Sequence, residues 1–135
     1  MRVYVNIIAL FLCLVATSQT GKVIKVKDGD TIVLLNEQNN QLTVRVADID
    51  CPEKGQPFSR AAKDFVSNEI FGQLVVVKAL KIDKYGRTVG LVLYDEKSLS
   101  EELLINGLAW HYSFFSDDEY LASLEAAAKE NRIGL

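Results

Sequence analysis

The first two thirds of the chain combine alternating apolar and polar residues with runs rich in β-branched residues, both typical of β-strands. Turn sequences separate these segments, with Asp28-Gly29-Asp30 after the first and the polar residues 36–40 after the second. The pattern therefore predicts five short strands, at residues 22–27, 31–35, 41–47, 74–80 and 88–94.

Helical spacing begins between the third and fourth strands, where apolar side chains recur three and four residues apart. Residues 57–71 begin with a proline and are followed by Gly72, a common residue just beyond a helix end. This segment is predicted to form one helix, because Ala61, Ala62, Phe65 and Val66 recur with helical spacing.

Two capping-box patterns, at residues 98–101 and 116–119, predict two helices after the last strand. The first is short and ends at Gly107. The second is expected to bury Tyr120, Leu121, Leu124 and Ala128. Five strands, a helix between the third and fourth, and helices at the end predict a small α+β barrel, in an order that fits the OB type.

The N-terminal residues differ in composition from the rest of the chain. Arg2 precedes an unbroken apolar run at residues 7–16, and small and polar residues follow at once. This is the layout of a secretory signal peptide, so we expect cleavage after Ser18, a domain over residues 19–135, and an exported protein. The alternatives are an uncleaved anchor and a buried first strand. After cleavage we expect a monomer without stable membrane association.

Charge limits the kind of partner that the mature protein can bind. Loss of Arg2 leaves 14 basic against 18 acidic residues, whereas proteins that coat nucleic acid usually carry a basic face. The balance argues against tight non-specific coating of DNA. It is compatible with a small site that depends on a bound cation.

The cysteine and histidine counts exclude two kinds of chemistry. Cys13 lies in the predicted leader, so the mature chain keeps Cys51 alone, together with a single histidine, His111. No intrachain disulfide, Cys/His zinc site or two-histidine acid–base pair can be built from them.

Carboxylates gather instead in two short segments. Asp30 lies in the first turn, and Asp50 and Glu53 follow the third strand. Carboxylate oxygens are the ligands that a hard cation such as Ca²⁺ prefers. Each residue also has a plainer interpretation, because Asp-Gly-Asp is a common hairpin turn and an isolated glutamate is usually a solvated surface residue.

Two arginines accompany these carboxylates. Alternation over residues 41–47 puts Leu42, Val44 and Val46 on one face, so Arg45 points away from the core. Arg87 ends the segment Asp83-Lys84-Tyr85-Gly86-Arg87. Guanidinium groups can bind a phosphate through two parallel hydrogen bonds. Either arginine could instead be a surface residue paired with Asp48 or Asp83.

Residues 28–31, 44–53 and 83–87, in this order and spacing, resemble the staphylococcal nuclease family, and the resemblance runs from about Gly21 to the C-terminus. It implies a five-stranded OB-type β-barrel with three helices. It also implies a site with Ca²⁺ on Asp30, Asp50 and the backbone carbonyl of Cys51. Asp28 would orient a bound water in this site, and its alternative role is that of a simple turn residue. Glu53 would position or activate the attacking water, and Arg45 and Arg87 would stabilise the transition state.

The resemblance also implies a substrate pocket. Lys84 and Tyr85 would touch the terminal phosphate and sugar, and Tyr112 and Phe115 are candidates for stacking on a base. We expect Trp110 and Phe114 to pack in the core. His111 is expected to be a partly buried histidine with a hydrogen-bond partner rather than a catalyst.

The function that follows is an exported, Ca²⁺-dependent phosphodiesterase. It would hydrolyse DNA and RNA with little sequence preference, favour single strands and leave 3′-phosphates. One alternative is a catalytically silent module of the same fold that binds nucleic acid or protein. Another is an OB-type barrel that binds oligosaccharide or peptide, which would leave the charged residues without a role.

Overall fold

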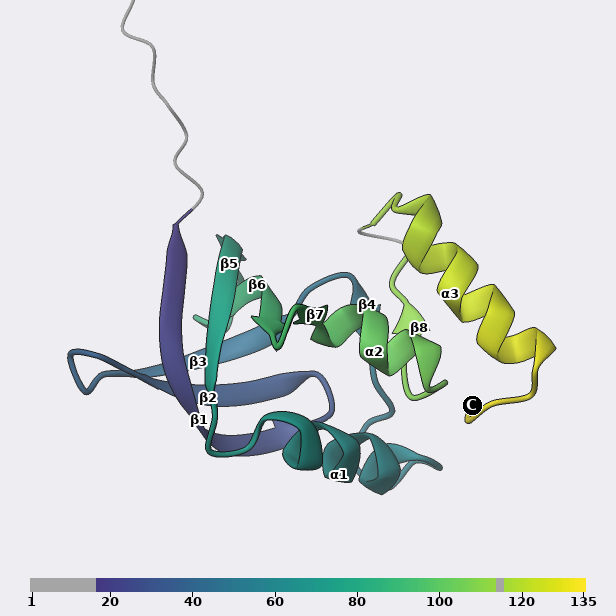
Figure 1. The fold of residues 1–135 in the computed structure, drawn as a ribbon, viewed down its shortest axis with the longest axis horizontal. Coiled ribbons are helices and arrows are strands. Elements are labelled where there is room, and N and C mark those ends of the chain that lie inside the picture. The colour runs from purple at the N-terminus through teal and green to yellow at the C-terminus, as the bar shows by residue number, and fades with distance from the viewer. Residues whose placement is uncertain (1–16, 114–115) are drawn as a thin grey trace, which may run out of the picture.

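The computed structural model describes residues 17–113 and 116–135, and its centre is a closed β-barrel (Figure 1). Neighbouring strands pair in the order β3-β2-β1-β5-β6, and a parallel pairing of β3 with β6 closes the barrel. The strands are β1 (Ser18–Asp28), β2 (Thr31–Asn36), β3 (Gln41–Val46), β5 (Leu74–Ile82) and β6 (Thr88–Tyr94). The five predicted strands and the OB-type barrel are thus confirmed.

Three short strands complete the sheets. β7 (Lys97–Ser98) pairs with β6, while β4 (Ile49–Asp50) pairs with β8 (Trp110–His111) in a separate two-stranded sheet. The second sheet brings the segment after the barrel strand β3 beside the C-terminal part of the chain.

The helices are α1 (Ser59–Ile70), α2 (Leu99–Ile105) and α3 (Glu119–Glu130). α1 contacts β1, and α2 packs between the barrel and α3 (Figure 1). The core is continuous from the inward faces of the strands to these helices. It includes Val23, Ile32, Val44, Val66, Val77, Leu103 and Leu104, all with essentially no solvent exposure.

The first strand is longer than its sequence pattern predicts. Residues 18–21 lack the apolar alternation, but they pair with β5 in a regular antiparallel ladder that joins Ser18 to Lys78. Backbone hydrogen bonds to a neighbouring strand form whatever the side chains are. The predicted cleavage after Ser18 therefore falls at the first residue of β1, and residues 1–16 lie outside the described part of the chain.

Four details predicted for the part of the chain after the last barrel strand are wrong. The side chain of Ser98 makes no capping hydrogen bond, and α3 is capped by Asp118, which accepts a hydrogen bond from the backbone N–H of Leu121. Tyr120 is 56% exposed rather than buried, because α3 begins later than the pattern suggested and only one side of it faces α2. Trp110, expected in the core, is 37% exposed on β8.

None of the helices formed by residues 17–113 and 116–135 is both long enough and apolar enough to cross a membrane.

The α2 core contact can be tested with two neighbouring residues. Leu103 is fully buried and Ile105, on the same helix, is 44% exposed. Leu103→Ala should lower the free energy of unfolding by about 2–5 kcal/mol, because it removes apolar contacts and leaves a cavity. Ile105→Ala, the matched control, should cost less than about 1 kcal/mol. Urea denaturation measures both, and equal losses would contradict this packing.

Candidate active site

The turn between β1 and β2 buries the carboxylate of Asp30. Its Oδ2 accepts a hydrogen bond from the backbone N–H of Cys51 at 3.0 Å, and its Oδ1 accepts one from the hydroxyl of Thr31 at 3.1 Å. Gly29 allows this close approach, since a Cβ there would lie 2.8 Å from Cβ of Ala62 on α1 and 2.9 Å from Sγ of Cys51. The turn is therefore fixed against both α1 and the segment after β4.

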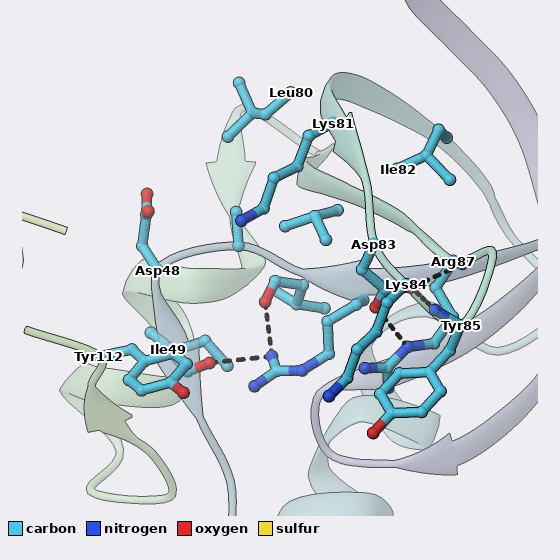
Figure 2. A pocket seen from close by; sticks show the side chains of 14 residues that line it. Asp48, Ile49, Leu80, Lys81, Ile82, Asp83, Lys84, Tyr85, Arg87 and Tyr112 are labelled. Carbon is cyan, nitrogen blue, oxygen red and sulfur yellow. Dashed lines mark hydrogen bonds and ion pairs between the residues drawn. The ribbon is translucent and has the colours of Figure 1, made fainter. Parts of the chain in front are cut away.

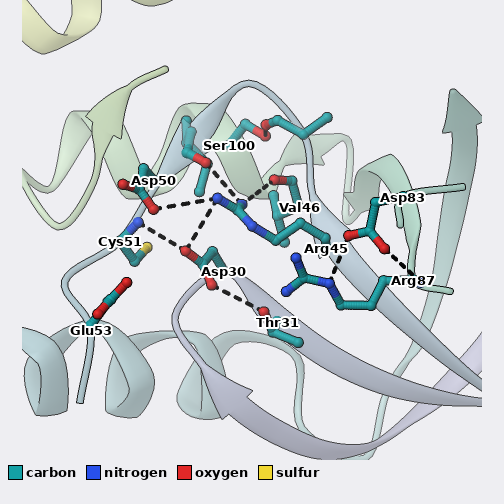
Figure 3. A network of polar contacts seen from close by, with 12 residues as sticks. Asp30, Thr31, Arg45, Val46, Asp50, Cys51, Glu53, Asp83, Arg87 and Ser100 are labelled. Atoms are coloured by element: carbon teal, nitrogen blue, oxygen red, sulfur yellow. Dashed lines mark hydrogen bonds and ion pairs between the residues drawn. The ribbon is translucent and has the colours of Figure 1, made fainter. Parts of the chain in front are cut away.

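Arg45 lies between two carboxylates (Figure 3). Its Nη2 is 3.5 Å from Oδ2 of Asp30 and 3.4 Å from Oδ1 of Asp50. Its Nη1 donates to the backbone carbonyls of Val46 at 2.7 Å and Ile49 at 2.9 Å. The side chain points away from the core as predicted, and its partners are Asp30 and Asp50 rather than Asp48.

The environment of Asp50 makes its carboxylate harder to ionise. Partial burial raises its pKa, Arg45 lowers it, and the nearby charges of Asp30 and Glu53 raise it again, with a net upward shift. The carboxylates of Asp30 and Glu53 are therefore close enough to Asp50 to repel its negative charge. A cation bound between Asp30 and Asp50 would relieve this repulsion.

Glu53 follows Pro52 in an irregular segment. Its backbone N–H donates to Oε1 of Gln56 at 2.6 Å, and its side chain points towards Asp30 and Cys51 (Figure 3). The carboxylate is exposed and lies on the same side of the barrel as the two aspartates.

Arg87 is held by the turn that precedes β6. Its Nε donates to Oδ2 of Asp83 at 2.8 Å, while Oδ1 of Asp83 accepts from the backbone N–H groups of Tyr85 and Arg87, each at 2.9 Å. Desolvation raises the pKa of Asp83, but these hydrogen bonds outweigh it and the net shift is downward. Among the residues that the structure describes, the side chain of Arg87 donates a hydrogen bond through Nε alone. Its Nη groups therefore remain available to a ligand.

A cleft of about 770 Å³ opens beside the two arginines (Figure 2). Lys84, Tyr85 and Tyr112 contribute to its lining, and their contacts with a substrate stay predictions. The amine of Lys84 and the guanidinium of Arg87 lie 5.1 and 5.4 Å from the centre of the Tyr85 ring. Phe114 and Phe115 lie outside the described residues, so their expected roles stay predictions.

The structure thus brings Asp30, Arg45, Asp50 and the amide of Cys51 into direct contact, and it lines the cleft with Arg45 and Arg87. Asp30, Asp50 and Glu53 do not line the cleft and lie on the other side of Arg45. In the described part of the chain, Asp28 forms no hydrogen bond or ion pair with Asp30 or Asp50, although its negative charge helps to raise the pKa of the Cys51 thiol.

The carboxylates of Asp30 and Asp50 lie on either side of Arg45 and suit a hard cation, but they supply fewer oxygen ligands than such a cation normally binds. Within residues 17–113 and 116–135, no group of three or more His, Cys, Asp or Glu side chains could hold a metal ion. Any such ion would need backbone carbonyl, water or substrate oxygens to complete its shell. The thiol of Cys51 is an unsuitable ligand, because burial above all raises its pKa.

Sequence reasoning missed part of the cleft. Leu80, Lys81, Ile82 and Val89 form one of its walls. The available signal was the nearly continuous apolar run of β5, since an exposed strand face normally has polar residues at every second position. The expected environment of His111 is confirmed, since it is half buried and its Nε2 lies 3.0 Å from the hydroxyl of Ser116.

Comparison with known proteins agrees with this geometry. Residues 43–135 match the family model described as staphylococcal nuclease homologue. The chain is 32% identical over 133 residues to an uncharacterized endonuclease of Haemophilus influenzae, covering 96% of this chain and 75% of the relative. It is 35% identical over 127 residues to a micrococcal nuclease of Shigella flexneri, covering 85% and 72%. It is 36% identical over 146 residues to Endonuclease Htp3 of Saprolegnia parasitica, covering 85% and 68%.

The structure is therefore a five-stranded OB-type barrel, and its candidate site combines two arginines with carboxylates that contact one of them. The chain belongs to the staphylococcal nuclease family.

The position of Arg45 between two carboxylates predicts a clear stability effect. Arg45→Gln leaves Asp30 and Asp50 without their common cation and should lower the free energy of unfolding at neutral pH by about 2 kcal/mol, less than for a fully buried pair because Asp50 is half exposed. Millimolar Ca²⁺ should recover part of this loss by replacing the missing charge.

The matched control is Arg60→Gln, which removes an exposed arginine 3.9 Å from Asp64 and should cost less than about 0.5 kcal/mol. Urea unfolding with Ca²⁺ and with chelator measures both variants. An Arg45→Gln variant as stable as the control would show that the carboxylates do not depend on Arg45.

Proposed function

We propose that this protein is a Ca²⁺-dependent nuclease that hydrolyses phosphodiester bonds of DNA and RNA with little sequence preference. The observation that carries the proposal is the contact of Arg45 with both Asp30 and Asp50 at the edge of a cleft that also contains Arg87. A cation held by these two carboxylates would lie next to two guanidinium groups that can bind phosphate. Membership of a family with relatives named micrococcal nuclease and endonuclease supports the same activity.

Asp30 and Asp50 would hold the ion, with the carbonyl of Cys51 as a further ligand and Asp28 orienting a water. When bound, Ca²⁺ supplies positive charge that draws a phosphate oxygen into the site. The chain fixes this geometry in advance, because Asp30 is held by the amide of Cys51 and the hydroxyl of Thr31.

Glu53 would position the attacking water and accept its proton as the phosphorus–oxygen bond forms. The proposed role needs a carboxylate close to the phosphate but not tightly paired with an arginine. No ion pair joins Glu53 to a basic residue in the described part of the chain, and its side chain points towards Asp30 (Figure 3).

Arg45 and Arg87 would stabilise the negative charge that accumulates on the phosphate oxygens during attack. Arg87 can do so with its Nη groups while Asp83 holds Nε. Arg45 is shared between the aspartates, so an ion bound there would weaken the hold of those carboxylates on Nη2 and leave it available to phosphate.

The cleft suits an unpaired strand. Lys84 offers positive charge, and Tyr85 and Tyr112 offer aromatic faces on which a base can stack whatever its identity. Phe115 is proposed as a further stacking residue. Cleavage of the 5′ phosphorus–oxygen bond, which would leave 3′-phosphates, is part of the same proposal, as are export through the leader ending at Ser18 and action as a monomer.

The rival function is a silent binding module of the same fold. Such a module would not need the full set of catalytic residues, whereas here Asp30, Arg45, Asp50, Glu53 and Arg87 are all present. That completeness favours the enzyme.

A substitution at Glu53 separates the two functions. Glu53→Gln keeps the size of the side chain but removes the proton acceptor, so kcat should fall by about 10²- to 10⁴-fold while KM stays near that of the wild type. Glu37→Gln, in the exposed turn after β2, is the control and should leave both constants unchanged. Initial rates on denatured DNA with Ca²⁺ give the constants, and undiminished turnover by Glu53→Gln would refute this mechanism.

A further inference from the structure

The side chain of Glu125 joins helix α3 to the short strand β8, which lies beside it (Figure 1). Its Oε2 accepts a hydrogen bond from the backbone N–H of His111, and its Oε1 lies 3.2 Å from Nζ of Lys129. The side chain of Lys129 is 60% exposed, and an exposed ion pair between residues four apart on a helix contributes little to stability. The contact of Glu125 with His111 is therefore the one that can matter to the structure.

This hydrogen bond occupies the outer edge of β8. In an antiparallel pair, successive residues of a strand direct their N–H groups alternately toward and away from the partner strand. The N–H of Tyr112 donates to the carbonyl of Asp48 at 2.9 Å, so the N–H of His111 points away from β4. Glu125 therefore pairs with a backbone group that β4 cannot reach.

Strand β4 contains two groups of the candidate site. It pairs with β8 through Ile49 opposite His111 and Asp50 opposite Trp110. The carbonyl of Ile49 accepts a hydrogen bond from Nη1 of Arg45 at 2.9 Å, and Oδ1 of Asp50 lies 3.4 Å from Nη2. A displacement of β8 would therefore move both a proposed cation ligand and the arginine beside it.

Two kinds of contact hold the segment around β4. Within the site, Arg45 donates to β4, and the amide of Cys51 donates to Oδ2 of Asp30 at 3.0 Å. These contacts involve the charged side chains that a bound cation would affect. From outside the site, the hydroxyl of Ser100 on α2 donates to the carbonyl of Ala47 at 2.8 Å, and β8 pairs with β4 itself. The contact with β8 is therefore one that does not depend on the charges of the site.

Strand β8 needs support of its own. It has two residues and pairs with β4 in a two-stranded sheet separate from the barrel, an arrangement that is marginally stable in water by itself. Helix α3 supplies a fixed partner, because it packs on α2 and buries Leu121 and Ala128. The hydrogen bond of Glu125 ties the backbone of β8 to that helix.

We propose that Glu125 is a positioning residue for the cation site, an inference that rests on the proposed Ca²⁺-dependent nuclease activity. By fixing β8 to α3, it holds Asp50 and the carbonyl of Ile49 where Asp30 and Arg45 meet them. A site that has its binding geometry only part of the time binds with an affinity reduced by that fraction. Loss of Glu125 should therefore weaken Ca²⁺ binding, whereas saturating Ca²⁺ should restore the geometry and kcat.

Three substitutions at Glu125 test this role. Glu125→Ala removes the acceptor, Glu125→Asp keeps the charge on a shorter side chain, and Glu125→Gln keeps an acceptor at the same reach. Glu130→Ala is the matched control, because it removes an exposed carboxylate from the same helix. Urea unfolding in chelator and in increasing Ca²⁺, without nucleic acid, gives the Kd for Ca²⁺ from the gain in the free energy of unfolding. Trp110, the single tryptophan of the chain, supplies the fluorescence signal.

Glu125→Ala and Glu125→Asp should raise the Kd for Ca²⁺ about tenfold. The Ca²⁺ concentration that gives half the maximal rate on denatured DNA should rise equally, while kcat at saturating Ca²⁺ stays within about twofold of the wild type. Glu125→Gln and Glu130→Ala should change both Ca²⁺ constants by less than about threefold. A merely structural role would lower stability equally in chelator and in Ca²⁺ and leave both constants unchanged. If Glu125→Ala does not fold, Glu125→Asp decides by the same constants.

Unchanged Ca²⁺ constants in Glu125→Asp, beside a wild type that requires Ca²⁺, would overturn the positioning role and leave the proposed nuclease activity intact. Equal defects in Glu125→Gln and Glu125→Ala would also overturn it, because Glu125→Gln keeps the hydrogen-bond acceptor. A wild type that Ca²⁺ neither stabilises nor activates would instead refute the proposed function, and the role of Glu125 with it.

Discussion

One guanidinium group organises the whole candidate site. Nη2 of Arg45 contacts the carboxylates of Asp30 and Asp50, and Nη1 holds the carbonyls of Val46 and Ile49. These partners come from the turn after β1, the end of β3 and strand β4. Arg45 thus compensates two nearby negative charges and fixes three chain segments at once. Without it, the repulsion between the two carboxylates would be uncompensated, although the amide of Cys51 and the hydroxyl of Thr31 would still hold Asp30.

Barrel closure explains why the second arginine lies close to the first. β3 and β6 pair in parallel with Val44 opposite Thr88 and Arg45 opposite Val89. Arg87 directly precedes Thr88, so the same pairing that closes the barrel places the turn containing Arg87 beside the strand containing Arg45. The hydrogen bonds of Asp83 then fix that turn. Two arginines 42 positions apart in sequence become neighbours through backbone pairing.

The sequence predicted the strands and the orientation of Arg45 because both follow from a period of two, a local property of the chain. It also identified the segments that meet at the site. It could not predict that Asp30 and Asp50 would share Arg45, since this depends on the β4–β8 pairing and on contacts over long sequence separations. The burial of Trp110 and Tyr120 was wrong for a related reason. Strand β8 has two residues, too few to show a period. α3 packs against α2 and β8, and the pattern within α3 does not specify how far around the helix those contacts extend.

We infer that phosphodiester hydrolysis depends on a cation held by the carboxylates around Arg45. Its most direct test is the release of acid-soluble nucleotides from denatured DNA by the exported protein, with millimolar Ca²⁺ and with excess chelator. We expect release with Ca²⁺, loss of release in chelator, and recovery when Ca²⁺ is restored. Equal release in chelator, or none by the folded protein with Ca²⁺, would contradict it.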